Sequence, residues 1–84
     1  MNKSLLELLE QEKKEVENIR FFRNSSDNFI NHAKNKEEGY NIDSCYRLAS
    51  EYEEKIRESK KKLIEIRKEL KKYISFLMEL EENT

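Results

Sequence analysis

Two side chains of this sequence could act together as a nucleophile and its base: Cys45, the only cysteine, and His32, the only histidine. An imidazole beside a thiol takes its proton and leaves the reactive thiolate. A metal site would have to recruit the carboxylates of Glu37, Glu38 and Asp43. A single glycine cannot build a Gly-rich phosphate loop. Because an isolated cysteine usually packs as a small apolar residue, we expect a non-catalytic protein without metal or cofactor.

Basic residues between positions 55 and 72 suggest a second kind of chemistry, contact with phosphates. At helical spacing several of them fall on the outer side of one helix, where such a stripe could follow a nucleic-acid backbone. The residues placed for this contact are Arg57, Lys61, Lys68 and Lys72. The net charge of −1 gives no independent sign of nucleic-acid binding. A solvated helix face is the favoured interpretation, and an RNA- or DNA-binding bundle remains the alternative.

A long helix must position these residues. Small or apolar residues recur from Cys45 to Leu80 at alternating steps of four and three, with no proline or glycine between them. Such a heptad pattern keeps one stripe of a helix against a partner helix. The stripe consists of Cys45, Ala49, Tyr52, Ile56, Ser59, Leu63, Ile66, Leu70, Tyr73, Leu77 and Leu80.

A second, weaker stripe precedes it and predicts a first helix. Ser4 and Glu7 have the spacing of a capping box. Glu12, Glu15 and Ser26 fall on or beside this stripe and weaken it, and residues Asn24–Asn28 are poor helix formers. Since the apolar phase continues across them, we expect one helix, bent or broken there at most. Its apolar residues are Leu5, Leu8, Leu9, Val16, Ile19, Phe22, Phe29, Ile30 and Ala33.

Gly39 is placed where the left-handed residue after a helix belongs, and Asp43 where the next helix would be capped. We therefore predict a helix over about 4–38, a connector over about 39–42 and a helix over about 43–81. So short a connector makes the helices antiparallel. The predicted fold is an all-α antiparallel helical hairpin, one domain of 84 residues, which self-associates into a four-helix bundle.

Composition agrees with this fold class. Charged residues make up 42% of the chain, which is typical of long helices and coiled coils. A single cysteine fits a reducing compartment, and neither a signal peptide nor a membrane-spanning run is recognisable, so we expect a cytoplasmic protein. The abundance of Lys, Glu, Asn and Ile suggests an AT-rich bacterial or phage genome.

Apolar residues outside the stripes indicate function. Near the open end of the hairpin they exceed what two helices can bury, so we expect a protein-binding surface there. Its residues are Leu5, Leu6, Leu9, Ile74, Phe76 and Met78. A smaller patch near the connector consists of Tyr40, Ile42 and Tyr46. It serves either as a secondary interaction patch or simply to close the helix ends.

The sequence thus predicts a protein–protein interaction module, such as an adaptor, inhibitor or regulatory subunit. Its expected partners are a second copy of itself and another protein, with nucleic acid as the alternative and no membrane. Small secreted helical hairpins share the predicted size and topology. Their Trp-x-Gly turn is absent here, where the connector reads Glu38, Gly39, Tyr40. A secreted hairpin partner is therefore kept only as a further alternative, and we claim no family resemblance.

Overall fold

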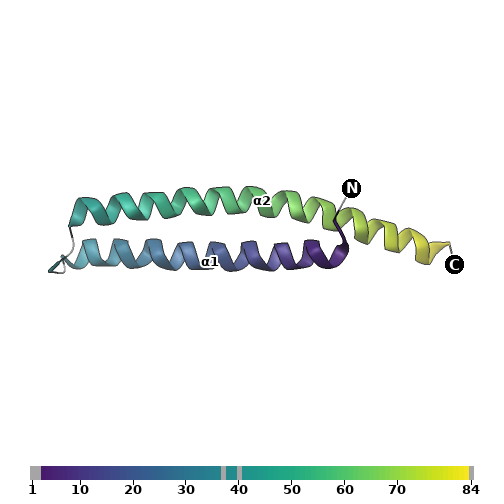
Figure 1. Ribbon diagram of the computed structural model, residues 1–84, viewed down its shortest axis with the longest axis horizontal. Coiled ribbons are helices and arrows are strands. Elements are labelled where there is room, and N and C mark those ends of the chain that lie inside the picture. Colours follow the sequence, from purple (N-terminus) through teal and green to yellow (C-terminus); the bar gives the residue numbers. More distant parts are fainter. Residues whose placement is uncertain (1–2, 37, 40, 84) are drawn as a thin grey trace.

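The computed structural model describes residues 3–36, 38–39 and 41–83, and it is a rod measuring 67 × 18 × 15 Å. Helix α1 spans Leu5–Asn35 and helix α2 spans Ile42–Glu82. The two helices lie side by side and antiparallel, joined at one end by a short connector (Figure 1). The described residues contain no strand and no helix long and apolar enough to cross a membrane. The predicted all-α hairpin of two long helices is confirmed.

Helix α1 is continuous. Its first turn is capped by Ser4, whose Oγ accepts a hydrogen bond from the backbone N–H of Glu7 at 3.2 Å. The helix passes through residues 24–28 without a break, although this stretch has low helix propensity. Ser26 explains why: it is fully buried, and its hydroxyl lies 3.1 Å from Oε1 of Glu53 in α2. Packing against α2 therefore outweighs local propensity here.

The end of α1 differs from the prediction. The helix ends at Asn35 rather than near residue 38, and Lys36 takes the left-handed conformation with φ 51° and ψ 43°. The Lys36 N–H donates to the carbonyl of Ala33 at 3.3 Å and so satisfies one of the last carbonyls of the helix. Gly39 also has a positive φ of 86°, but it lies inside the connector. The prediction that Gly39 caps α1 is therefore wrong.

The start of α2 also differs from the prediction, because its N-cap lies two residues earlier in the sequence. Asn41, not Asp43, is the N-cap, and its side chain accepts from the N–H of Ser44 at 3.0 Å. Asparagine and aspartate cap helices about equally well, so residue type alone does not decide between the two positions. Asp43 instead lies in the first turn, where its negative charge interacts favourably with the positive end of the helix dipole.

The heptad stripe of α2 is confirmed over most of its length. Tyr52, Ile66 and Tyr73 are half-buried, while Leu77 and Leu80 are exposed. The stripe therefore faces α1 only as far as Tyr73. The fully buried residues of the stripe are Cys45, Ala49, Ile56, Ser59, Leu63 and Leu70.

The stripe of α1 is partly wrong as predicted. Leu8 and Ala33 are buried, but Leu9 is exposed, while Glu15 and Ser26 are buried in its place. Leu8 and Glu15 lie seven residues apart, so the rotation of the helix that buries one also buries the other. The same rotation turns Leu9 outward.

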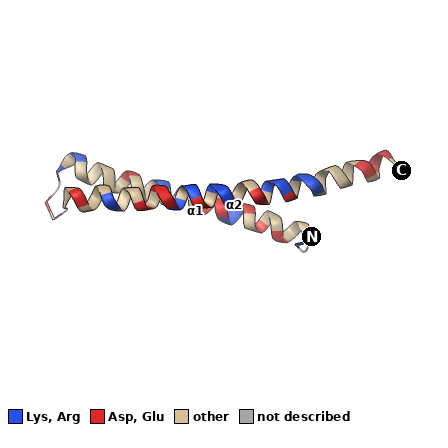
Figure 2. Ribbon diagram, turned by 90° about the horizontal axis from the view of Figure 1, so that it is seen from above, with Lys and Arg blue, Asp and Glu red and all other residues tan. Residues whose placement is uncertain are grey.

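Contacts between the helices fix their register. Nε of Arg67 donates to Oε2 of Glu12 at 3.0 Å, which joins the acidic start of α1 to the basic part of α2. Nearer the connector, the rings of Phe29 and Tyr52 stack with their centroids 6.0 Å apart. Figure 2 shows basic and acidic residues distributed along both helices rather than separated between them. At Arg67 and Glu12, opposite charges meet across the hairpin.

Candidate protein-interaction surface

At the open end of the hairpin, α2 extends beyond the start of α1 (Figure 1). Helix α1 has 31 residues and α2 has 41, so α2 continues past the start of α1. The hydroxyl of Tyr73 donates to the backbone carbonyl of Lys3 at 2.5 Å, which marks the level at which α1 begins. Every residue from 74 to 82 is exposed. We refer to residues 74–82 as the tail of α2.

The tail is apolar on most sides of the helix. Ile74, Phe76 and Met78, which the sequence singles out, are between 56% and 57% exposed. Leu77 and Leu80 add to them at 48% and 47%. The heptad pattern assigns these two leucines to the seam, but α1 is too short to cover them. A contiguous exposed surface of this kind usually marks an association site.

The first turns of α1 contribute to the same end of the molecule. Leu6 is 66% exposed and Leu9 47%, while Leu5 is half-buried. The contact between Lys3 and Tyr73 places the start of α1 beside the base of the tail. The structure thus brings both parts of the predicted surface to the open end. We call this the open-end surface, made of Leu5, Leu6, Leu9, Ile74, Phe76 and Met78.

The secondary patch lies at the other end of the rod. Ile42 and Tyr46 are exposed at 41% and 45%. They are four residues apart in the first turns of α2 and therefore share a face. Tyr40, the third predicted member, lies outside the described residues. The two apolar regions are thus separated by nearly the whole length of α2.

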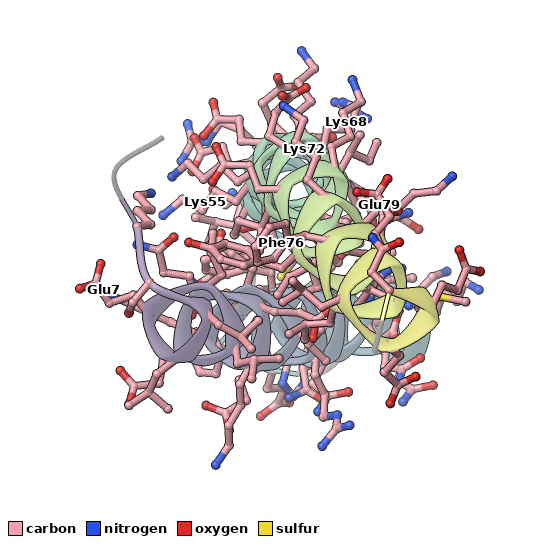
Figure 3. All side chains as sticks on the ribbon, turned by 90° about the vertical axis from the view of Figure 1, so that its right-hand side faces the viewer. Glu7, Lys55, Lys68, Lys72, Phe76 and Glu79 are labelled. Carbon is pink, nitrogen blue, oxygen red and sulfur yellow. The ribbon has the colours of Figure 1, made fainter. Side chains whose placement is uncertain are left out.

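The basic stripe lies on the outer side of α2. Figure 3 shows Lys68 and Lys72 directed away from α1. Nε of Arg57 donates to Oε2 of Glu54 at 3.0 Å, and Nζ of Lys68 donates to Oε1 of Glu65 at 3.2 Å. The hydrogen bond and positive charge of Arg57 lower the pKa of the Glu54 carboxyl. Arg57 and Lys68 therefore each donate a hydrogen bond to a carboxylate. All four residues that the sequence places for phosphate contact are exposed: Arg57, Lys61, Lys68 and Lys72.

A groove of about 540 Å³ runs between the helices on the side of Glu15. Glu15 is only 8% exposed. Its Oε1 accepts from Nδ2 of Asn18 at 3.1 Å, while Oε2 is buried without a hydrogen-bond partner among the described residues. A buried polar atom left unpaired reduces stability. The groove is lined by Leu8, Gln11, Lys62, Ile66 and Glu69, among others.

The two residues with catalytic potential lie on different helices. Cys45 is a buried free thiol in the seam of α2, and His32 is half-buried in the last turn of α1. Glu37, one of the proposed metal ligands, lies outside the described residues. In the part of the chain that is described, no group of three or more His, Cys, Asp or Glu side chains could hold a metal ion.

No family model, curated protein or solved structure matches this chain. Its function has to be inferred from the chemistry of its own surfaces. Of these, the open-end surface departs furthest from an ordinary solvated helix face, because large apolar side chains are exposed there on both helices.

Proposed function

We propose that this protein is a non-catalytic protein-interaction module, an adaptor, inhibitor or regulatory subunit, that acts through helical surfaces. The main support for this proposal is the tail of α2, where the large apolar side chains are about half exposed. We further propose that the protein forms a homodimer in which two hairpins associate as a four-helix bundle. The same surface would then be shared between self-association and binding of another protein.

The energetics of a small domain support this proposal. Full burial of one Phe or Leu side chain contributes roughly 1.5–3 kcal/mol. A single-core domain of this size is usually stable by only a few kcal/mol. Covering the tail therefore matters on the scale of the whole stability of the fold. Folding and association should be coupled, so that the melting temperature rises with protein concentration.

Nucleic-acid binding is the second candidate, favoured by the exposed Lys and Arg side chains of α2. Against it, Glu54, Glu65 and Glu12 each accept a hydrogen bond from a basic residue of this block. Phosphates would have to compete with these carboxylates. We therefore rank nucleic-acid binding below protein binding. A cytoplasmic location is also proposed, since the buried thiol of Cys45 suits a reducing compartment.

Sedimentation equilibrium tests the main proposal. The wild-type protein should be dimeric at micromolar concentration, and the double variant Phe76→Glu, Met78→Glu should be monomeric with a lower melting temperature. A control variant, Lys61→Glu with Lys68→Glu, introduces the same two glutamates on the outer side of α2, with an even larger change of charge, and should leave both measurements nearly unchanged. A wild-type monomer at high micromolar concentration, still cooperatively folded, would overturn the homodimer.

A further inference from the structure

One face of α2 has apolar residues at both ends and opposite charges at matching positions between them. Tyr46, Glu53, Lys60, Arg67 and Ile74 follow one another at intervals of seven residues, which places them on one side of a helix. The two outer positions are apolar, and the two inner positions carry opposite charges. Lys60 lies midway between them. Such a face is complementary to itself when it is turned end over end.

This face is open to solvent in the hairpin. Tyr46 and Ile74 are 45% and 56% exposed, and the three charged residues between them are exposed as well. Ile42 and Met78 extend the symmetry, since each lies four residues outside one of the apolar positions and is itself exposed. The face therefore includes Ile74 and Met78 of the open-end surface and Ile42 and Tyr46 of the secondary patch.

We propose that a second copy of this chain covers this face, with the two α2 helices antiparallel about a two-fold axis at Lys60. This inference rests on the proposed self-association and specifies its geometry. Tyr46 then lies opposite Ile74 of the second copy, and Glu53 lies opposite Arg67 of the second copy. By symmetry each pairing occurs twice, as in any interface in which both subunits use the same patch.

Charge and hydrophobicity select this arrangement over its neighbours. A parallel pairing in register would bring Glu53 against Glu53 and Arg67 against Arg67, which like-charge repulsion disfavours. Shifting the antiparallel register by one heptad would place Ile74 opposite either Glu53 or the connector. Of these arrangements, only the register centred on Lys60 sets Tyr46 against Ile74 and Glu53 against Arg67, and its one like-charge pair is Lys60 with Lys60.

The charged residues of the face can take these additional partners. Arg67 already donates to Glu12, and Glu53 already lies within hydrogen-bond distance of Ser26. A guanidinium has five N–H donors and a carboxylate about four acceptor positions, so each has capacity for the second copy. The two Lys60 side chains meet near the axis, where their long stems allow the ammonium groups to reach solvent.

Cysteine cross-linking tests the register directly. In a Cys45→Ser background, Lys60→Cys places a thiol near the axis, where it should form a disulfide with its own counterpart under mild oxidation. The matched control, Lys61→Cys, moves the thiol to the adjacent face and should give little covalent dimer. Glu53→Cys alone and Arg67→Cys alone should each give little covalent dimer. When the two variants are mixed, unfolded and refolded together, they should cross-link, because residue 53 of one copy lies opposite residue 67 of the other.

The outcomes distinguish a failure of this geometry from a failure of the proposed self-association. A wild-type protein that sediments as a monomer would overturn both the self-association and this geometry. A dimer in which Lys60→Cys cross-links no better than Lys61→Cys would overturn the geometry alone. A charge test gives a second readout: Glu53→Lys should weaken dimerisation about tenfold, and adding Arg67→Glu should restore it. Failure of that restoration would also count against the register.

Discussion

The Oγ of Ser26 lies 3.1 Å from Oε1 of Glu53 and 3.4 Å from the backbone carbonyl oxygen of Ala49, so a side chain of α1 reaches the main chain of α2. Such a contact requires the two helices to approach closely. Small buried side chains make this approach possible. They are Ser26 and Ala49 at this point and Ala33 and Cys45 nearer the connector. Ser26 therefore fits the seam through its small size, even though it is polar.

This contact predicts how substitutions at Ser26 behave. Ser26→Leu should destabilise the fold by roughly 1–3 kcal/mol, because the larger side chain has no space beside Ala49. Ser26→Ala should cost no more than about 1 kcal/mol, the net value of an ordinary hydrogen bond. Urea denaturation followed by circular dichroism measures both. Stabilisation by leucine would show that the helices are not closely packed at this point.

At Glu15, unlike at Ser26, we expect replacement by leucine to stabilise the fold. Its carboxylate is buried, and Oε2 has no hydrogen-bond partner among the described residues, so Glu15→Leu should remove an unfavourable group and add apolar burial. We expect the free energy of unfolding to rise by about 1–2 kcal/mol in urea titrations. The control is Glu17→Leu, an exposed position on the same helix, which should change stability by less than about 0.5 kcal/mol. Equal effects of the two substitutions would mean that Glu15 is not buried in solution.

The sequence pattern predicts the hairpin and the seam of α2 well, because heptad spacing and helix caps are local signals. It fails at Leu9, which is exposed, whereas Glu15 and Ser26, which the pattern places on or beside the stripe of α1, are buried although they are polar. Burial there depends on the rotation of α1, which packing along the whole of α2 determines. Leu77 and Leu80 are wrongly assigned to the covered seam for another reason: their exposure depends on the relative lengths of the helices and on where the connector begins.

The end of α1 allows a third prediction. Lys36 adopts φ 51°, a left-handed conformation that costs a residue with a Cβ more than it costs glycine. Lys36→Gly should therefore raise stability by about 0.5–1 kcal/mol, measured as an increase in melting temperature. The same substitution two residues earlier, Lys34→Gly inside the helix, should lower stability by about 1 kcal/mol. A loss of stability in both variants would place the end of α1 beyond Lys36.

The fourth prediction concerns nucleic acid. The basic residues of α2 are paired with carboxylates at several points, so duplex RNA and DNA should bind weakly or not at all at ordinary salt concentration. Fluorescence anisotropy with labelled duplexes measures this. Sub-micromolar binding that falls steeply with salt, and that Lys61→Glu or Lys68→Glu weakens, would reverse the ranking of the two functions.

Hydrogen exchange of the α2 tail gives the last prediction. Tail amides take part in bonds within their own helix, and the side chains of residues 74–82 are exposed. The last turn contains no basic residue, so the carboxylates of Glu79 and Glu82 lie at the negative end of the helix dipole. In an isolated hairpin the tail should therefore open easily, and its amides should exchange much faster than those between Ala49 and Leu70.

Association changes that expectation in a measurable way. When the protein concentration rises from about 1 μM to several hundred μM, tail exchange should slow by at least roughly tenfold, because opening then requires dissociation. The Phe76→Glu, Met78→Glu variant serves as the control, since its tail should exchange rapidly at every concentration. If exchange of the wild-type tail did not depend on concentration while sedimentation detected a dimer, the dimer would have to form elsewhere on the hairpin. The tail would then be available for a different protein.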